Sequence, residues 1–312
     1  MARIDDLVLA ALNSLPEKPG PKTSSATKKR YSEQMSAALA PAFGAELRAR
    51  GLSGARPAGP GEIDAGTGAE RRLSGGIGAK RVDVSWATEE SGLIFGLSIK
   101  SINFRDGTTK NFQKNLVNRR GDMLIEAVTL HRRFPYAVLG GLLFLDKDAA
   151  RDDTEQRRST FANAFPRLRM FTGRTDPTGR DEQYERLYLV LVDANRFTSS
   201  VRCFRVDQDG VETTLAELLD DMIELVLERN PDFYEPTTDG GIQRVGTRPR
   251  KTKSRTKGGN TKPTSTSSEP RLQDADDTDT DDASGDIPEV GDPDDDYDDT
   301  DDTDDTDDTD DQ

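Results

Sequence analysis

The spacing of apolar residues changes along the chain, and these changes predict its elements. In the N-terminal part, apolar positions recur every three or four residues, as in a helix with one buried face. This spacing predicts a short helix at 4–12 and a longer one at 24–47, with Pro41 as a kink or break in the second. Gly, Pro and Ala then crowd residues 51–61, which indicates a loop leading into the main body.

From residue 80 the period changes to two, which is typical of β-strands. Val82, Val84 and Trp86 alternate with polar residues, so we expect them to share a buried face of one strand. A second alternating run at 93–104 follows a polar turn at 87–92. The two runs predict a β-hairpin.

The pattern after the hairpin predicts further helices and strands in alternation. They are a helix at 111–133 interrupted at Gly121, a buried strand at 136–145, a helix at 149–165, a polar loop at 172–181, strands at 186–193 and 201–206, and a helix capped by Thr214 and Glu217. No core element is expected after Pro236. This order predicts an α/β or α+β body in which a mixed β-sheet is flanked by helices.

Charge divides the 312-residue chain into a nearly neutral body and a charged tail. Residues 1–243 hold 34 Lys/Arg and 35 Asp/Glu, residues 244–262 hold eight Lys/Arg and no acid, and residues 269–312 hold 23 Asp/Glu and one Arg. A segment with few apolar residues and like charges cannot bury enough surface to fold, so we expect a disordered tail. The predicted parts are an N-terminal helical region at 1–60, a core at 61–238 and a disordered tail at 239–312.

Composition also limits the chemistry. No run approaches the roughly 18 apolar residues of a membrane span, and the first residues lack the layout of a secretion signal, so we expect a cytoplasmic protein. Cys203 and His131 are the single cysteine and histidine, which excludes an internal disulfide framework, a Cys/His zinc site and most histidine-based acid–base chemistry. We expect both to be structural. Catalysis would rest on carboxylates, Lys and Arg, together with a hard metal ion.

One acid and one lysine of the hairpin are the main candidates for chemistry. Ser98 and Lys100 are two residues apart and share a face of the second strand, and the alternation of the first strand turns Asp83 toward them. An acid and an ammonium at one sheet edge suit metal-assisted phosphodiester hydrolysis. Asp83 and a backbone carbonyl, that of Ile99, would bind Mg²⁺, and Lys100 would orient or deprotonate the attacking water. A plain cross-strand ion pair is the alternative.

Asp83 and the tripeptide Ser98-Ile99-Lys100 resemble the signature of the PD-(D/E)xK nuclease superfamily, which is an acid on one strand and acid-x-Lys on the next. The segments that look like bacterial restriction-endonuclease-type proteins are GGIGAKRVDVSW, SIKSINFRD, NFQKN, RRGDML and LHRRFPYAVLGG, within roughly residues 62–145. The resemblance implies a restriction-endonuclease-like fold and a Mg²⁺-dependent DNA endonuclease that acts in defence against foreign DNA. It also implies a cognate methyltransferase as a partner.

The chain departs from this signature at Ser98, where the superfamily has an acid. Some members resemble this pattern and supply the carboxylate from the following helix, which implies Glu126, with Asp122 on the adjacent turn. Glu70 is the alternative, from the preceding helix. If neither completes the site, the protein is a catalytically degenerate DNA-binding or regulatory protein on the same fold.

Basic and amide side chains near the hairpin are the candidates for DNA contact. They are Arg105, Lys110, Lys114, Asn115, Asn118, Arg119 and Arg120, with an ordinary solvated helix surface as the alternative. Cutting palindromic duplex DNA would favour a homodimer. The basic part of the tail is a candidate non-specific DNA arm, while the acidic part could compete with DNA, bind a basic partner or only promote solubility.

Overall fold

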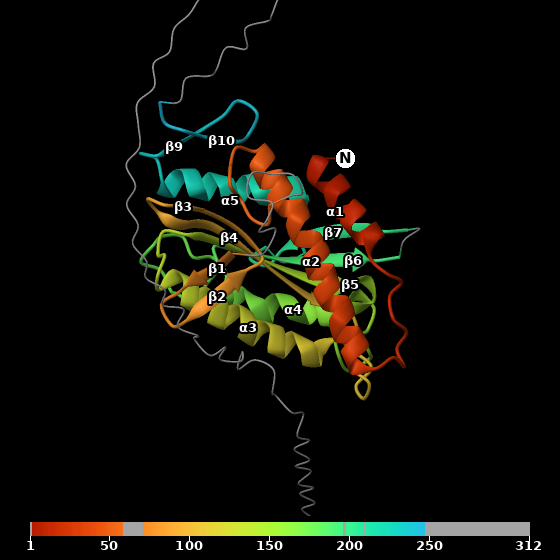
Figure 1. Ribbon diagram of the computed structural model, residues 1–312. Helices are drawn as coiled ribbons and strands as arrows, with labels where there is room; N and C mark the ends of the chain where they lie inside the picture. The colour runs from red at the N-terminus through yellow and green to blue at the C-terminus, as the bar shows by residue number, and fades with distance from the viewer. Residues whose placement is uncertain (1, 59–70, 196–197, 209, 247–312) are drawn as a thin grey trace, which may run out of the picture. The chain divides into compact units, whose positions relative to one another are not determined.

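A six-stranded mixed sheet forms the centre of the protein (Figure 1). The computed structural model describes residues 2–58, 71–195, 198–208 and 210–246. In spatial order the strands are β3 (Val84–Thr88), β4 (Gly92–Ile102), β5 (Val138–Asp146), β6 (Arg186–Asp193), β7 (Ser200–Arg205) and β8 (Glu212–Thr213). β4, β5 and β6 are parallel, and the other neighbours are antiparallel. The predicted hairpin is confirmed as β3 and β4.

Helices cover both faces of this sheet (Figure 1). One face packs against α1 (Arg3–Ser14), α2 (Ser25–Ala49) and α5 (Leu215–Arg229), and the other packs against α3 (Gln113–His131) and α4 (Thr160–Leu168). Each face has its own cluster of buried apolar residues. The predicted mixed sheet flanked by helices is therefore confirmed, and so is a helical N-terminal region.

Neither of the two predicted breaks within helices is present. α2 continues through Pro41, and α3 continues through Gly121. The predicted helix at 149–165 is also wrong in its first half, which contains the 3-10 helix η2 (Lys147–Ala150) and then irregular chain. The buried Asp152 carboxylate accepts hydrogen bonds from the backbone N–H and the hydroxyl of Thr160, so its local bonds favour a turn before α4 begins.

The predicted first strand, which begins at residue 80, is divided between two sheets in the structure. β1 (Arg71–Ser74) and β2 (Ala79–Val82) form a separate two-stranded sheet, and the chain breaks at Asp83 before β3. Val82 joins the core cluster of α3, whereas Val84 and Trp86 join the cluster of α2. The expectation that these three residues share a face is wrong, because the break at Asp83 changes the direction of the side chains.

A short hairpin also contributes to the core after the last predicted element. β9 (Tyr234–Pro236) pairs with β10 (Ile242–Arg244), and both Tyr234 and Ile242 are buried. The Tyr234 ring packs edge-on against Trp86 with their ring centres 5.0 Å apart. The expectation of no core element after Pro236 is therefore wrong. Most of the predicted tail lies outside the described residues, and the predicted domain boundaries stay predictions.

Candidate active site

Asp83 reaches β4 at the point where the ladder between β3 and β4 ends. Val84 pairs with Leu97, so the chain just before β3 lies beside the following residues of β4. The backbone N–H of Ile99 donates a hydrogen bond of 2.5 Å to Asp83 Oδ2. Lys100 Nζ lies 3.7 Å from the same oxygen. The predicted meeting of Asp83 and Lys100 is therefore confirmed as geometry.

Glu126 completes the cluster from α3. Its side chain is 2% exposed, and its Oε2 lies 3.1 Å from Lys100 Nζ. The hydroxyl of Ser98 donates a hydrogen bond of 3.1 Å to the same oxygen. The serine that stands at the position of the expected acid thus binds a carboxylate supplied by the next helix. We call Asp83, Lys100 and Glu126 the triad.

The two other proposed acids have different positions. Asp122 is one turn before Glu126, but its side chain is 47% exposed and pairs with Arg119 at 2.9 Å. Glu70 lies outside the described residues. Among the described residues, Glu126 is therefore the carboxylate that joins Asp83 at Lys100.

The carboxylates keep Lys100 charged. Burial alone would lower the pKa of this ammonium, but the negative charges of Glu126 and Asp83 outweigh burial and raise the pKa above its ordinary value. A charged ammonium donates hydrogen bonds and cannot accept a proton. The geometry therefore favours Lys100 as a group that orients water and offsets negative charge, rather than as a base.

Asp83 and Glu126 are the carboxylates of the triad that could hold a hard divalent cation with few protein ligands. The described residues contain no group of three or more His, Cys, Asp or Glu side chains arranged to hold a metal ion. Mg²⁺, however, commonly uses one or two carboxylates and keeps several waters. Asp83 and Glu126 both lie close to the Lys100 ammonium, and their formal charges exceed that of Lys100 by one. The carbonyl of Ile99 points to the same strand edge as its N–H, which is the edge that Asp83 occupies.

Tyr184 is a neighbour of the triad that sequence reasoning missed. Its side chain is buried, and its hydroxyl donates a hydrogen bond of 3.0 Å to the carbonyl of Met123 on α3. Burial raises the pKa of this phenol well above its ordinary value, and the charge of Glu126 raises it further. Tyr184 follows a polar loop in the sequence, so no periodic pattern marks it as a residue of the core.

The predicted DNA-contacting residues lie in the loop before α3 and on the first turns of this helix. Arg105 and Lys110 belong to the loop between β4 and α3, and Lys114, Asn115 and Asn118 are exposed on the first turns of the helix. Three arginines already have partners: Arg105 lies 3.8 Å from Asp148, Arg119 pairs with Asp122, and Arg120 lies 5.9 Å from the centre of the Phe171 ring. The structure leaves the DNA-binding role of this set a prediction.

The single histidine and cysteine are both buried. His131 Nε2 lies 3.3 Å from Glu185 Oε2, and its Nδ1 is 3.0 Å from the carbonyl of Asp181. Burial raises the pKa of the Cys203 thiol to about 12, so this residue is not an activated nucleophile. Both are structural, as the sequence predicts.

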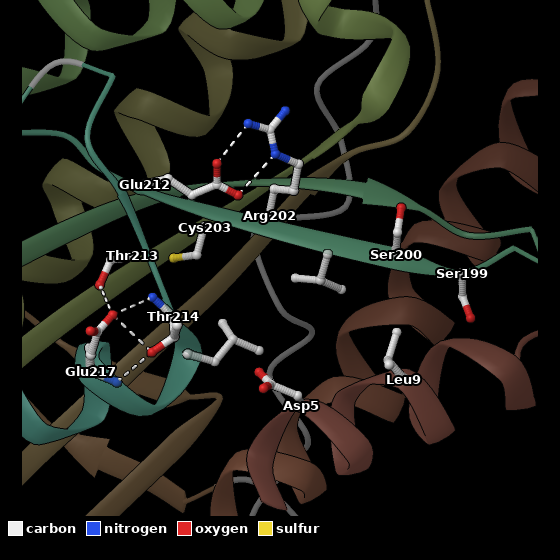
Figure 2. A pocket seen from close by; sticks show the side chains of 12 residues that line it. Asp5, Leu9, Ser199, Ser200, Arg202, Cys203, Glu212, Thr213, Thr214 and Glu217 are labelled. Carbon is white, nitrogen blue, oxygen red and sulfur yellow. Dashed lines mark hydrogen bonds and ion pairs between the residues drawn. The ribbon is translucent and has the colours of Figure 1, made fainter. Parts of the chain in front are cut away.

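A hollow of about 480 Å³ lies away from the triad, between α1, β7 and the start of α5 (Figure 2). None of its lining residues belongs to the triad. Four of its polar groups bind one another, since Arg202 pairs with Glu212 at 2.7 Å and Glu217 caps α5 through Thr214 (Figure 2).

Comparison of the chain with family models, with curated proteins and with solved structures found no match in any of the three. The helices of the described residues include none that is long and apolar enough to cross a membrane. Any functional conclusion therefore rests on the geometry of the triad and on the sequence signature.

Proposed function

We propose that the protein is a Mg²⁺-dependent DNA endonuclease of restriction type that hydrolyses phosphodiester bonds. The observation that carries the proposal is the convergence of Asp83 and Glu126 on Lys100, although the three residues come from a strand break, a helix and a strand. In this proposal the helix carboxylate replaces the acid that is missing at Ser98.

Each residue of the site has a distinct role in the proposed reaction. Asp83, Glu126 and the carbonyl of Ile99 would hold Mg²⁺. When bound, this ion would polarise the phosphate and lower the pKa of a bound water. Lys100 would position the attacking water and offset the negative charge that develops on the phosphate. Ser98 would hold one oxygen of Glu126 in place.

The arrangement of elements supports a restriction-endonuclease-like fold as part of this proposal. An antiparallel hairpin leads through α3 into β5, which is parallel to β4. The proposed signature residues all lie where β3, β4 and α3 meet. A cytoplasmic location, a role in DNA defence and a cognate methyltransferase belong to the same proposal.

Cleavage of supercoiled plasmid DNA with Mg²⁺ tests the proposal. We expect the wild-type chain to nick or linearise plasmid, and we expect Asp83→Asn, Lys100→Ala and Glu126→Gln each to reduce the rate by about 10²-fold or more. Asp122→Asn is the matched control, because it removes a carboxylate from the same helix outside the triad and should retain activity. Equal cleavage by all variants would reject these roles, and cleavage that persists in EDTA would reject the metal dependence.

A second candidate function is DNA binding without cleavage. Ser98 in place of the usual acid, and two rather than three clustered acids, favour it. This candidate predicts DNA affinity that falls steeply with salt and no cleavage with any divalent ion. The plasmid assay combined with a salt titration of binding therefore separates the two.

A further inference from the structure

The sheet ends in an incomplete edge at β7. β6 pairs with the whole of β7, whereas β8, on the other side, pairs only with Cys203 and Phe204. Thr214 then caps α5, so the chain leaves the sheet after these two pairs. No strand of the described residues therefore lies beside residues 200–202 on this side.

Val201 directs its backbone groups to this open edge. In an antiparallel ladder, successive residues direct their N–H and C=O groups to opposite edges of the strand. The N–H of Arg205 donates a hydrogen bond of 3.3 Å to the carbonyl of Val211, on the side of β8. Val201 lies four residues earlier on the same strand, so its N–H and C=O point to the same side, beyond the end of β8. An edge with such groups can bind a further strand.

The hollow of about 480 Å³ lies along this open edge (Figure 2). Its lining includes residues 199–203, which contain the unpaired part of β7, together with Asp5 and Leu9 of α1 and the start of α5. Val201 and Leu215 belong to this lining and pack with the core cluster on this face of the sheet, so the hollow has an apolar floor. Its volume is in the range of pockets that bind ligands. A strand added at the edge would therefore find room for a side chain beside it.

The charges around the hollow favour a basic partner. Its described lining residues include three acids, Asp5, Glu212 and Glu217, and one cation, Arg202, which leaves two net negative charges. Arg202 pairs with Glu212 at 2.7 Å, so the lining offers no further cation to Asp5 and Glu217. Pairing of β7 with β7 of a second copy would bring the acids of two hollows together, and nucleic acid would add phosphates to them. A segment that carries Lys or Arg would instead offset the charge.

We propose that the open edge of β7 binds an extended basic segment of another protein as an added strand. The residue of this segment that lies opposite Val201 would exchange two backbone hydrogen bonds with it, and its side chain would enter the hollow beside that of Val201. Lys or Arg two positions before and after this residue would share its face, toward Asp5 and Glu217. None of the lining residues belongs to the triad, so this binding does not depend on the proposed nuclease activity.

Short peptides test the proposal on the full chain. The probes are dye-labelled peptides Lys-Thr-X-Thr-Lys, in which X is Ala, Val, Leu, Ile or Phe, and fluorescence anisotropy measures their affinity. We expect at least one to bind, and we expect methylation of the amide of X to weaken it by about tenfold or more, because a hydrogen bond to the edge is lost. Replacement of both Lys by Glu should also weaken binding. Failure of every peptide to bind, or equal affinity of the methylated or acidic peptides, would overturn the proposal.

Substitution of Asp5 tests the location of the site. We expect Asp5→Lys to weaken peptide binding by about tenfold or more, because it reverses a charge of the lining. Asp6→Lys is the matched control, since Asp6 is an exposed acid of the same helix outside the lining, and it should bind as wild type does. Asp5 also accepts a hydrogen bond of 3.1 Å from the backbone N–H of Ala2, so thermal unfolding checks that the variant is folded.

Hydrogen exchange of the wild-type chain gives a second measurement that needs no variant. We expect saturating peptide to slow the exchange of the Val201 amide, because the added strand would bond to this edge. Unchanged exchange at Val201, or equal affinity of the folded Asp5→Lys and Asp6→Lys variants, would overturn the proposal.

Discussion

Lys100 is the residue on which the two carboxylates of the site depend. Its ammonium lies 3.1 Å from Glu126 and 3.7 Å from Asp83, in a place where Glu126 is almost fully buried. A buried carboxylate that loses its counter-charge is costly, because neither water nor another cation replaces the lost partner. The same two carboxylates should attract a divalent cation when the ammonium is removed.

We therefore expect Lys100→Met to lower the free energy of unfolding by about 3–5 kcal/mol, and we expect added Mg²⁺ to restore part of that loss. Urea unfolding with and without Mg²⁺ measures both effects. Lys147→Met is the matched control, since Lys147 is a half-exposed lysine paired with Asp193, and its loss should cost about 1 kcal/mol or less with no Mg²⁺ response. A Lys100→Met variant that is indifferent to Mg²⁺ would count against a metal at this position.

At the scale of elements, Glu185 joins the sheet to helices on both faces. Its carboxylate accepts a hydrogen bond of 2.7 Å from the backbone N–H of Leu139 on β5 and contacts His131 of α3 at 3.3 Å. Arg229 of α5 donates to it at 2.7 Å, and the buried Arg174 lies at 3.3 Å. Burial opposes ionisation, but the contact with His131 and the charges around it prevail and lower the pKa of Glu185.

The lowered pKa of Glu185 predicts how the contribution of its contacts to stability changes in acid. An unfolded glutamate titrates near pH 4.3, so the stabilisation from Glu185 is present above that pH and is lost as the pH falls toward the lower folded-state pKa. We expect Glu185→Gln to reduce the free energy of unfolding by about 3–5 kcal/mol at neutral pH, because it leaves buried cations without their acid. The difference from wild type should shrink below about pH 4.

Unfolding at several pH values measures this difference, with Glu182→Gln as the control near the surface. Glu182 pairs with Arg180, which is 64% exposed, so its substitution should change stability little at any pH. A Glu185→Gln variant as stable as wild type at neutral pH would show that the contacts of the Glu185 carboxylate contribute nothing to the free energy of unfolding. A difference that stays constant into strong acid would contradict its electrostatic origin.

Elements with a continuous periodic signal could be predicted from the sequence, and those shaped by a few side-chain bonds could not. The capping pair Thr214 and Glu217 marks the start of α5, and both of its hydrogen bonds are present. The break at Asp83 has no such signal, because Val82 and Val84 continue the alternation while the chain changes sheets. Glycine also misleads, since propensity predicts an interruption at Gly121, where the helix continues.

At the scale of the whole molecule, the mixed sheet flanked by helices and the meeting of Asp83, Lys100 and Glu126 could be anticipated. The hairpin spacing brings Asp83 and Lys100 together, and the resemblance pointed to α3 for the third group. Tyr184 could not be found in the same way, because it is distant in sequence and follows an irregular loop. Contacts between distant segments depend on packing that local patterns do not record.

The charge division of the chain also belongs to this scale. Residues 1–243 hold 34 Lys/Arg and 35 Asp/Glu, so a nearly neutral body carries the triad, while residues 269–312 hold 23 of the acids. The net charge of −15 therefore describes the tail more than the body that holds the site. Attraction of a cation to the triad must come from Asp83 and Glu126 themselves.

The most direct measurement is anomalous diffraction from crystals of the protein soaked in Mn²⁺, which takes the same oxygen ligands as Mg²⁺. The account predicts a peak bound by the carboxylates of Asp83 and Glu126 and the carbonyl of Ile99, and its loss in Glu126→Gln. A site without a peak at saturating Mn²⁺, or a peak that survives removal of the Glu126 carboxylate, would contradict the account.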